Sequence, residues 1–277
     1  MSSLFFKTME GMNKMDYLQG FYDGTLAFAE VVEQKRDLTL FKISHEFSLM
    51  IACDSDGGIG NKEHDFVKVE NWLTGYFGAR VALMEILAAK GRPWLLIDTL
   101  AVEMDPAGKE IISGIRKACA EAGVHDLPLT GSTEDNIPTV QTGIGVTVLA
   151  IVKNDQIPVG SSQKGDLVAV AGIPKSGPQF QVEPEDPELI SLQDLWRLRE
   201  IPGVHDILPV GSKGVAYEAG ELAKSAGLQL RLGETDLDLL RSGGPATSVV
   251  FSLLNNDVLQ TVKEAISAPI KLIGELY

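Results

Sequence analysis

The chain has 277 residues, enough for one large domain or two ordinary ones with a buried core. Its 24 Lys and Arg against 38 Asp and Glu give a formal net charge of −14, which disfavours nucleic acid and anionic membrane surfaces as partners. No apolar run reaches the roughly 18 residues of a membrane-spanning helix, and two cysteines are too few for a disulfide framework. We therefore expect a soluble cytoplasmic protein with Cys53 and Cys119 in its core. If its substrate is a polyphosphate, so acidic a protein would need Mg²⁺ between its carboxylates and that substrate.

The first half of the chain alternates predicted strands and helices. Residues 1–14 are expected to form a loose extension, without the features of a signal peptide. β-Branched and aromatic residues over 38–53 predict a pair of strands, the second of them buried. The spacing of apolar residues predicts a helix over 66–90 that stops at residues 91–93. Further patterns predict a strand over 94–103, a helix over 107–122 and a strand over 143–152.

A polar stretch over residues 153–165, with a proline, glycines and paired serines, predicts a boundary between two domains. We place an N-terminal domain at residues 1–158 and a C-terminal domain at residues 159–277. In the second half the patterns predict strands over 166–172, 248–254 and 270–273, and helices over 188–200, 215–226 and 256–265. The mixed order of strands and helices indicates an α+β fold.

An acidic segment broken by glycines follows the buried strand. Asp54 and Asp56 alternate, so they would lie on one face of an extended strand and could share a hard cation. Lys62 could meet a phosphate as a point charge. Three glycines would let backbone N–H groups approach that phosphate: Gly57, Gly58 and Gly60. A solvated turn has the same composition, and the segment matches neither a Walker P-loop nor a Rossmann fingerprint.

Further carboxylates are candidates for metal binding or catalysis, and each has an ordinary alternative. Glu85 lies within the predicted helix, where a solvent-facing position would explain it, and Asp98 could simply end a strand. Glu134 and Asp135 could belong to a turn or a helix N-cap. Asp37 follows two basic residues, as turn residues often do. The four histidines show no paired metal spacing, and no zinc-protease or nucleophile-elbow motif occurs.

The order of these motifs resembles that of the PurM-like enzymes, which include aminoimidazole-ribonucleotide synthetases, thiamine-monophosphate kinases and selenophosphate synthetases. Asp56–Lys62 resembles the D-G-V-G-T-K segment of the synthetases with one residue inserted. Glu85–Pro93 resembles their N-D-I-x-x-x-G-x-x-P helix end, and Leu129–Glu134 resembles their G-G-D-T or G-G-E-T turn, from which Ser132 and Thr133 depart.

The resemblance continues in the second half. Gly165–Val168 and Gly172–Pro178 are similar to a strand and a loop of the family, and Val204–Ile207 is similar to its h-D-(I/V) segment. The G-G-L that follows in the family is lost at Gly211–Val215. Asp37 lies seventeen residues before Asp54, a spacing similar to that between two carboxylate motifs of the thiamine-monophosphate kinases.

This resemblance implies a two-domain PurM-like α+β fold, in which N-terminal strands form a barrel at a dimer interface and a C-terminal α+β domain follows. It also implies a homodimer, ATP near that interface and several Mg²⁺ ions on carboxylates. The implied metal ligands are Asp37, Asp54, Asp56, Glu85 and Glu134. Asp54 or Asp135 could serve as the base that orients the acceptor hydroxyl.

Within the superfamily, the D-S-D-G-G-I-G-x-K segment and Thr130–Thr139 look most like the α-ribazole kinases of Firmicutes. That resemblance implies ATP-dependent phosphorylation of the 5′-hydroxyl of α-ribazole, a step in salvage of the cobalamin lower ligand. Its partners would be ATP and a small nucleoside-like substrate. Two alternatives stay open. One is a PurM-like enzyme that acts on thiamine monophosphate or activates an amide oxygen, as aminoimidazole-ribonucleotide synthetases do. The other is a nucleotide-binding protein without turnover.

Overall fold

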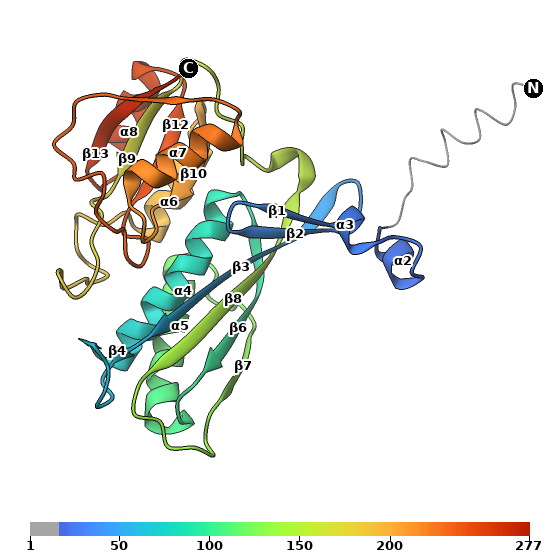
Figure 1. Cartoon of the computed structure of the whole chain (residues 1–277), viewed down its shortest axis with the longest axis vertical. Helices are drawn as coiled ribbons and strands as arrows, with labels where there is room; N and C mark the ends of the chain where they lie inside the picture. Colours follow the sequence, from blue (N-terminus) through green and yellow to red (C-terminus); the bar gives the residue numbers. More distant parts are fainter. Residues whose placement is uncertain (1–16) are drawn as a thin grey trace, which may run out of the picture.

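The computed structural model describes residues 17–277, so the extension predicted for residues 1–14 lies outside the described part. Two β-sheets and one long helix between them organise the chain (Figure 1). That helix, α4 (Asn71–Ala88), contacts strands of both sheets, and most of its residues are buried. A helix that is apolar nearly all round needs partners on every side. The sequence of α4 therefore favours this central position.

The first sheet has six strands, all antiparallel to their neighbours except the last pair, which is parallel. In spatial order they are β1 (Val32–Lys35), β2 (Leu38–Lys42), β3 (Phe47–Gly57), β8 (Gly143–Lys153), β6 (Arg92–Leu100) and β7 (Leu129–Thr133). Short elements flank the sheet: α2 (Tyr17–Tyr22), α3 (Phe28–Val31), the parallel pair β4 (Ile59–Gly60) and β5 (Val67–Lys68), a π-helical turn (Met104–Gly108) and a 3₁₀ turn (Asn154–Gln156).

Helix α5 (Lys109–Glu121) packs against α4 at a distance that only glycine permits. A Cβ atom on Gly75 of α4 would lie 1.9 Å from the carbonyl oxygen of Ile111. A Cβ on Gly114 of α5 would lie 1.8 Å from the carbonyl oxygen of Trp72. The two glycines thus bring the helix backbones into direct contact, which fixes how α5 lies against α4.

The second sheet has five antiparallel strands. In spatial order they are β10 (Val204–Pro209), β12 (Val249–Leu253), β9 (Leu167–Ala171), β13 (Ile270–Leu276) and β11 (Leu230–Leu232). Its helices are α6 (Leu192–Glu200), α7 (Val215–Ser225) and α8 (Asn256–Ala265). Side chains cap two of them, because Ser191 accepts a hydrogen bond from the backbone of Asp194 and Asn255 does the same for Val258.

Among residues 17–277, one face of the first sheet is covered by neither α4 nor α5, although Phe21 of α2 packs against Phe41 of β2 there. Along β8, Val146, Val148 and Ala150 are buried on the side of α4, whereas the alternate residues are only partly buried. We call the other side the open sheet face. Its apolar residues include Leu49, Ile51, Leu149, Ile151 and the largely exposed Trp94. Cys53 lies on this face and is exposed, so the prediction that it is a core residue is wrong, whereas Cys119 is buried as predicted.

The α+β fold is confirmed, with some changes in element bounds. The helix predicted over 66–90 begins only at Asn71, because Val67 and Lys68 pair with Ile59 and Gly60 instead. The sequence patterns also did not predict strands β7, β10 and β11.

The chain passes from the first sheet to the second between Lys153 and Leu167, and one apolar core continues across both. A domain boundary after residue 158 stays a prediction. Within residues 17–277, no helix combines the length and apolar character needed to cross a membrane.

Candidate functional site

A cleft of about 1600 Å³ is lined by residues from both halves of the chain. Strand β3, helix α4 and the β4–β5 segment line one side, and α7 with the loops around residues 176–183, 209–212 and 242–245 lines the other. Pockets for a single small molecule usually measure about 300–1,000 Å³, so this cleft has room for a nucleotide and a second substrate. Seven carboxylates line it: Asp37, Asp54, Asp56, Glu70, Glu85, Glu183 and Glu218.

Asp54 and Asp56 lie on the same face of β3, as their alternation predicted. Gly78 of α4 makes room for Asp56, because a Cβ there would lie 3.2 Å from Oδ2 of that residue. Burial raises the pKa of Asp56 to about 6, and the charge of Asp54 adds to this. Burial also raises the pKa of Asp54. Two acids whose ionised forms repel each other in this way favour a cation between or beside them.

Glu85, Glu218 and Asp37 bring carboxylates to the cleft from three separate parts of the chain. Burial raises the pKa of Glu85 to about 8, and the charges of Asp37 and Glu218 contribute, while Arg36 opposes them. Burial and the charge of Asp37 raise the pKa of Glu218 to about 7. Helix α7 therefore adds an acid from the second sheet to those carried by β3 and α4.

This set of donors fits Mg²⁺, which prefers hard carboxylate oxygens. Among residues 17–277, no three acids, histidines or cysteines already lie close enough to form a complete metal cage. Mg²⁺ is commonly held by one or two carboxylates together with water and substrate phosphates. The cleft thus offers the carboxylates that the protein would contribute to such a site.

The remaining wall of the cleft is apolar and aromatic, with Phe66, Trp72, Phe77 and Phe180 among its lining. Phe66 is 79% exposed at the β4–β5 segment, and the guanidinium of Arg241 lies 5.0 Å from the ring of Phe180. Aromatic faces of this kind stack well on flat heterocyclic rings. The cleft therefore combines a cluster of carboxylates with aromatic side chains that could stack on a flat ring.

Lys68 is the only lysine or arginine among the described residues that line the cleft. Its ammonium donates hydrogen bonds to the backbone carbonyl oxygens of Lys62 and Glu63. The one cation of the lining is thus already occupied by the main chain, and anionic groups in the cleft would have to be held through bound metal ions.

The glycines and lysine that were predicted to hold phosphate do not line the cleft. Lys62 pairs with Glu103 at 2.6 Å, and Gly58 donates its N–H to the carbonyl oxygen of Thr142. A Cβ on Gly60 would lie 2.4 Å from Oγ1 of Thr142, so close packing explains this glycine. Gly57 does not line the cleft either. The role of these four residues in phosphate binding stays a prediction, and for Lys62 it would require its ion pair to open.

Glu134 and Asp135 also lie outside the cleft lining. Glu134 accepts hydrogen bonds from the backbone of Asn136 and Ile137. Asp135 accepts them from the N–H of Met104 and from Thr133, which hold its pKa below the usual range. Both acids thus make the hydrogen bonds expected of turn residues. Their roles as metal ligand and base stay predictions.

Sequence reasoning missed Glu218. It lies in the first turn of α7, just after Gly211–Val215, a segment noted only because the family's G-G-L is lost there. The sequence did offer one signal, an acid in the first turn of a helix that follows a loop with two glycines. Its proximity to Asp37 and Glu85 could not be read from the sequence, because it depends on how the two sheets pack.

Residues 36–152 match the family model described as AIR synthase related protein, N-terminal domain. This range contains Asp37, Asp54, Asp56 and Glu85, and it ends within β8. The matched range runs from the turn before β2 into β8 and includes helices α4 and α5.

Solved structures extend the likeness in fold to nearly the whole chain. Thiamine-monophosphate kinase from Stenotrophomonas maltophilia K279a aligns with a TM-score of 0.61 and 15% identity, covering 95% of this chain and 93% of that one. The structure of AaThiL complexed with AMPPCP and TMP aligns with a TM-score of 0.61 and 14% identity, covering 93% and 90%. The chain thus has a PurM-like α+β fold.

A curated relative, selenide, water dikinase of Aeromonas hydrophila, is 28% identical over 184 residues. The alignment covers 60% of this chain, and the chain spans about half the length of that relative, 52%.

Proposed function

We propose that the protein transfers the γ-phosphoryl group of ATP to a hydroxyl of a small nucleoside, and that α-ribazole is the acceptor. The acidic cleft carries this proposal, because its seven carboxylates face a space large enough for two substrates. The AMPPCP bound to AaThiL, a methylene analogue of ATP, supports a nucleotide as one occupant. The kinase names of the similar proteins support phosphoryl transfer as the reaction.

In this mechanism Asp37, Asp54, Asp56 and Glu85 would hold Mg²⁺, and Glu218 would approach from α7. Bound Mg²⁺ would neutralise the charge on the transferring phosphoryl group. The protein's part is to position the reactants and to accept a proton. Asp54 could receive the proton of the acceptor hydroxyl, since burial already raises its pKa. The aromatic wall would orient the flat ring of the acceptor and keep water out.

The charge of the lining favours an acceptor without a phosphate of its own. Thiamine monophosphate and formylglycinamidine ribonucleotide each carry a phosphate, which an acidic cleft with one occupied lysine holds poorly. α-Ribazole has a flat benzimidazole ring, a ribose and no phosphate. The likeness in fold to thiamine-monophosphate kinases supports thiamine monophosphate as the second candidate.

A small acceptor panel tests the proposal. With Mg²⁺ and ATP, we expect ADP release with α-ribazole at least about 100-fold faster than without acceptor, because correct positioning of the two reactants is worth that much or more. Thiamine monophosphate and formylglycinamidine ribonucleotide are expected to stay near the background rate. Faster turnover of either phosphorylated compound would move the function to that substrate, and silence with tight ATP binding would favour a binding protein.

We also propose a homodimer that pairs two copies through the open sheet face. Apolar residues of β3 and β8 on this face are only partly buried in the single chain, and a second copy would bury them further. Replacing Ile151 by glutamate should convert the dimer to a monomer in analytical ultracentrifugation, since it puts an unpaired charge in the middle of the contact. Lys263→Glu on the exposed side of α8 serves as the matched control and should leave the dimer intact. A dimer that survives Ile151→Glu would exclude this interface.

A further inference from the structure

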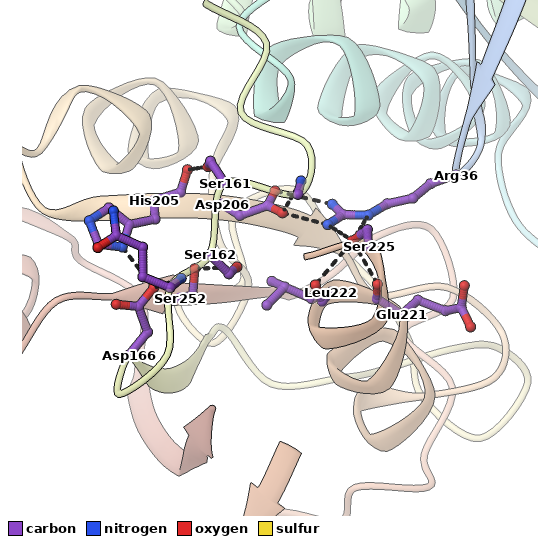
Figure 2. A network of polar contacts seen from close by, with 12 residues as sticks. Arg36, Ser161, Ser162, Asp166, His205, Asp206, Glu221, Leu222, Ser225 and Ser252 are labelled. Atoms are coloured by element: carbon purple, nitrogen blue, oxygen red, sulfur yellow. Dashed lines mark hydrogen bonds and ion pairs between the residues drawn. The ribbon is translucent and has the colours of Figure 1, made fainter. Parts of the chain in front are cut away.

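Arg36 reaches from the first sheet into the second. It lies in the turn between β1 and β2 with a positive φ of 53°, a conformation that non-glycine residues adopt at some cost. Figure 2 shows its guanidinium pointing at Asp206 of β10 and Ser225 of α7. Nη1 lies 3.1 Å from Oδ1 of Asp206, and Nη2 lies 2.5 Å from Oδ2. This is the bidentate geometry in which arginine binds a carboxylate most firmly.

The partners of Arg36 are themselves fixed in place. Asp206 is fully buried, and it also accepts a hydrogen bond of 2.9 Å from the N–H of Gly160. The hydroxyl of Ser225 accepts from Nε of Arg36 at 3.1 Å and donates to backbone carbonyls of α7, as Figure 2 shows. A single side chain from the first sheet is thus tied both to a buried strand and to a helix of the second.

The contact made by Arg36 connects two segments that each carry a carboxylate of the cleft. Asp37, the next residue, lines the cleft, and so does Glu218, which α7 carries seven residues before Ser225. Arg36 therefore links the backbone that presents Asp37 to the helix that presents Glu218. Its charge also opposes the effect of burial, which raises the pKa of Glu85.

A second arginine joins the two parts of the chain without touching the cleft. Arg199 of α6 donates a hydrogen bond of 3.1 Å to the carbonyl oxygen of Leu87, at the end of α4. Its side chain is 10% exposed, and that of Arg36 is 8% exposed. The two residues are matched in type and burial, so they separate general attachment of the two parts from a specific effect on the cleft.

We propose that Arg36 is a positioning residue, whose ion pair with Asp206 and bond to Ser225 hold Asp37 and Glu218 at the spacing that one Mg²⁺–nucleotide complex requires. This inference rests on the proposed function, because it gives that site its geometry. Arg36 itself does not line the cleft. Its replacement should change how the site binds metal, beyond any change in folding stability.

The test compares Arg36→Met with Arg199→Met in the full-length chain. Both variants should lower Tm, because each leaves polar groups without a partner. Only Arg36→Met is expected to weaken Mn²⁺ binding in an electron paramagnetic resonance titration, and to raise the Mg²⁺ concentration that gives half-maximal activity. Its kcat should fall about 10- to 100-fold, the loss expected from a displacement of about 1 Å in the site.

Arg36→Lys adds a readout that depends on geometry. Lysine restores the charge but cannot form the two parallel hydrogen bonds to Asp206. It should recover much of the lost Tm and little of the lost Mn²⁺ affinity. Equal effects of the two methionine variants on Mn²⁺ binding, or wild-type binding and turnover in Arg36→Met, would overturn this inference alone. Absence of Mn²⁺ binding and of turnover in the wild-type protein would overturn the proposed function together with it.

Discussion

Replacing Asp54 by asparagine is expected to lower kcat for ADP formation by about 100-fold or more, the range seen when a proton acceptor or a charge-stabilising group is removed. Asp54 lies near the C-terminal end of β3, and its negative charge helps to raise the pKa of Asp56. Asparagine keeps the size and shape of the side chain but can neither carry the charge nor take a proton at that oxygen. Steady-state kinetics at saturating Mg²⁺ and ATP measure the effect.

Glu63→Gln is the matched control for Asp54→Asn. Glu63 is an exposed acid of the neighbouring segment that does not line the cleft. Its neutralisation should change kcat by no more than about twofold, as for an ordinary surface position. Thermal melts of both variants should lie close to that of the wild-type protein. Full activity in Asp54→Asn would contradict the placement of the chemistry at β3.

Replacing Gly114 by alanine should lower the free energy of unfolding by about 3 kcal/mol, the upper part of the range for overpacked cores. The new Cβ would lie 1.8 Å from the carbonyl oxygen of Trp72, which belongs to the backbone of α4 and cannot turn aside as a flexible side chain could. The helices would have to separate, with a loss of about 6–12 °C in Tm for a chain of this size. Calorimetry or circular dichroism measures the shift.

Gly220→Ala makes the same chemical change where it meets no obstacle. Gly220 lies within α7, and a Cβ there would have no atom within 4 Å. Alanine has the higher helix propensity, so this variant should gain up to about 1 kcal/mol. A loss of stability in Gly220→Ala, or none in Gly114→Ala, would show that the α4–α5 contact is not as close as described.

The features that the sequence predicted well are local ones. The common face of Asp54 and Asp56 follows from strand alternation, and the central part of α4 follows from the spacing of its apolar residues. The predicted start of that helix was too early, because Phe66–Lys68 also fits helical spacing. The pairing of β5 with β4, eight residues earlier in the chain, decides otherwise.

The features that could not be predicted depend on contacts between distant residues. The ion pair of Lys62 with Glu103 is one such contact, and the role of Lys62 as a phosphate ligand stays a prediction. The approach of Glu218 to Asp37 and the tie between Arg36 and Asp206 each join the two sheets across long stretches of chain. A single sequence contains no signal for how two sheets pack on a shared helix, so the half of the cleft that comes from the second sheet emerged only from the structure.

The most direct test of phosphoryl transfer follows the γ-phosphoryl group itself. The protein is incubated with α-ribazole, Mg²⁺ and ATP whose γ-phosphoryl oxygens are labelled with ¹⁸O, and the acceptor is then weighed by mass spectrometry. We expect α-ribazole to gain one phosphoryl group that carries the label, in equal amount to the ADP formed. ADP formation with the label only in inorganic phosphate, and an acceptor of unchanged mass, would contradict the kinase account.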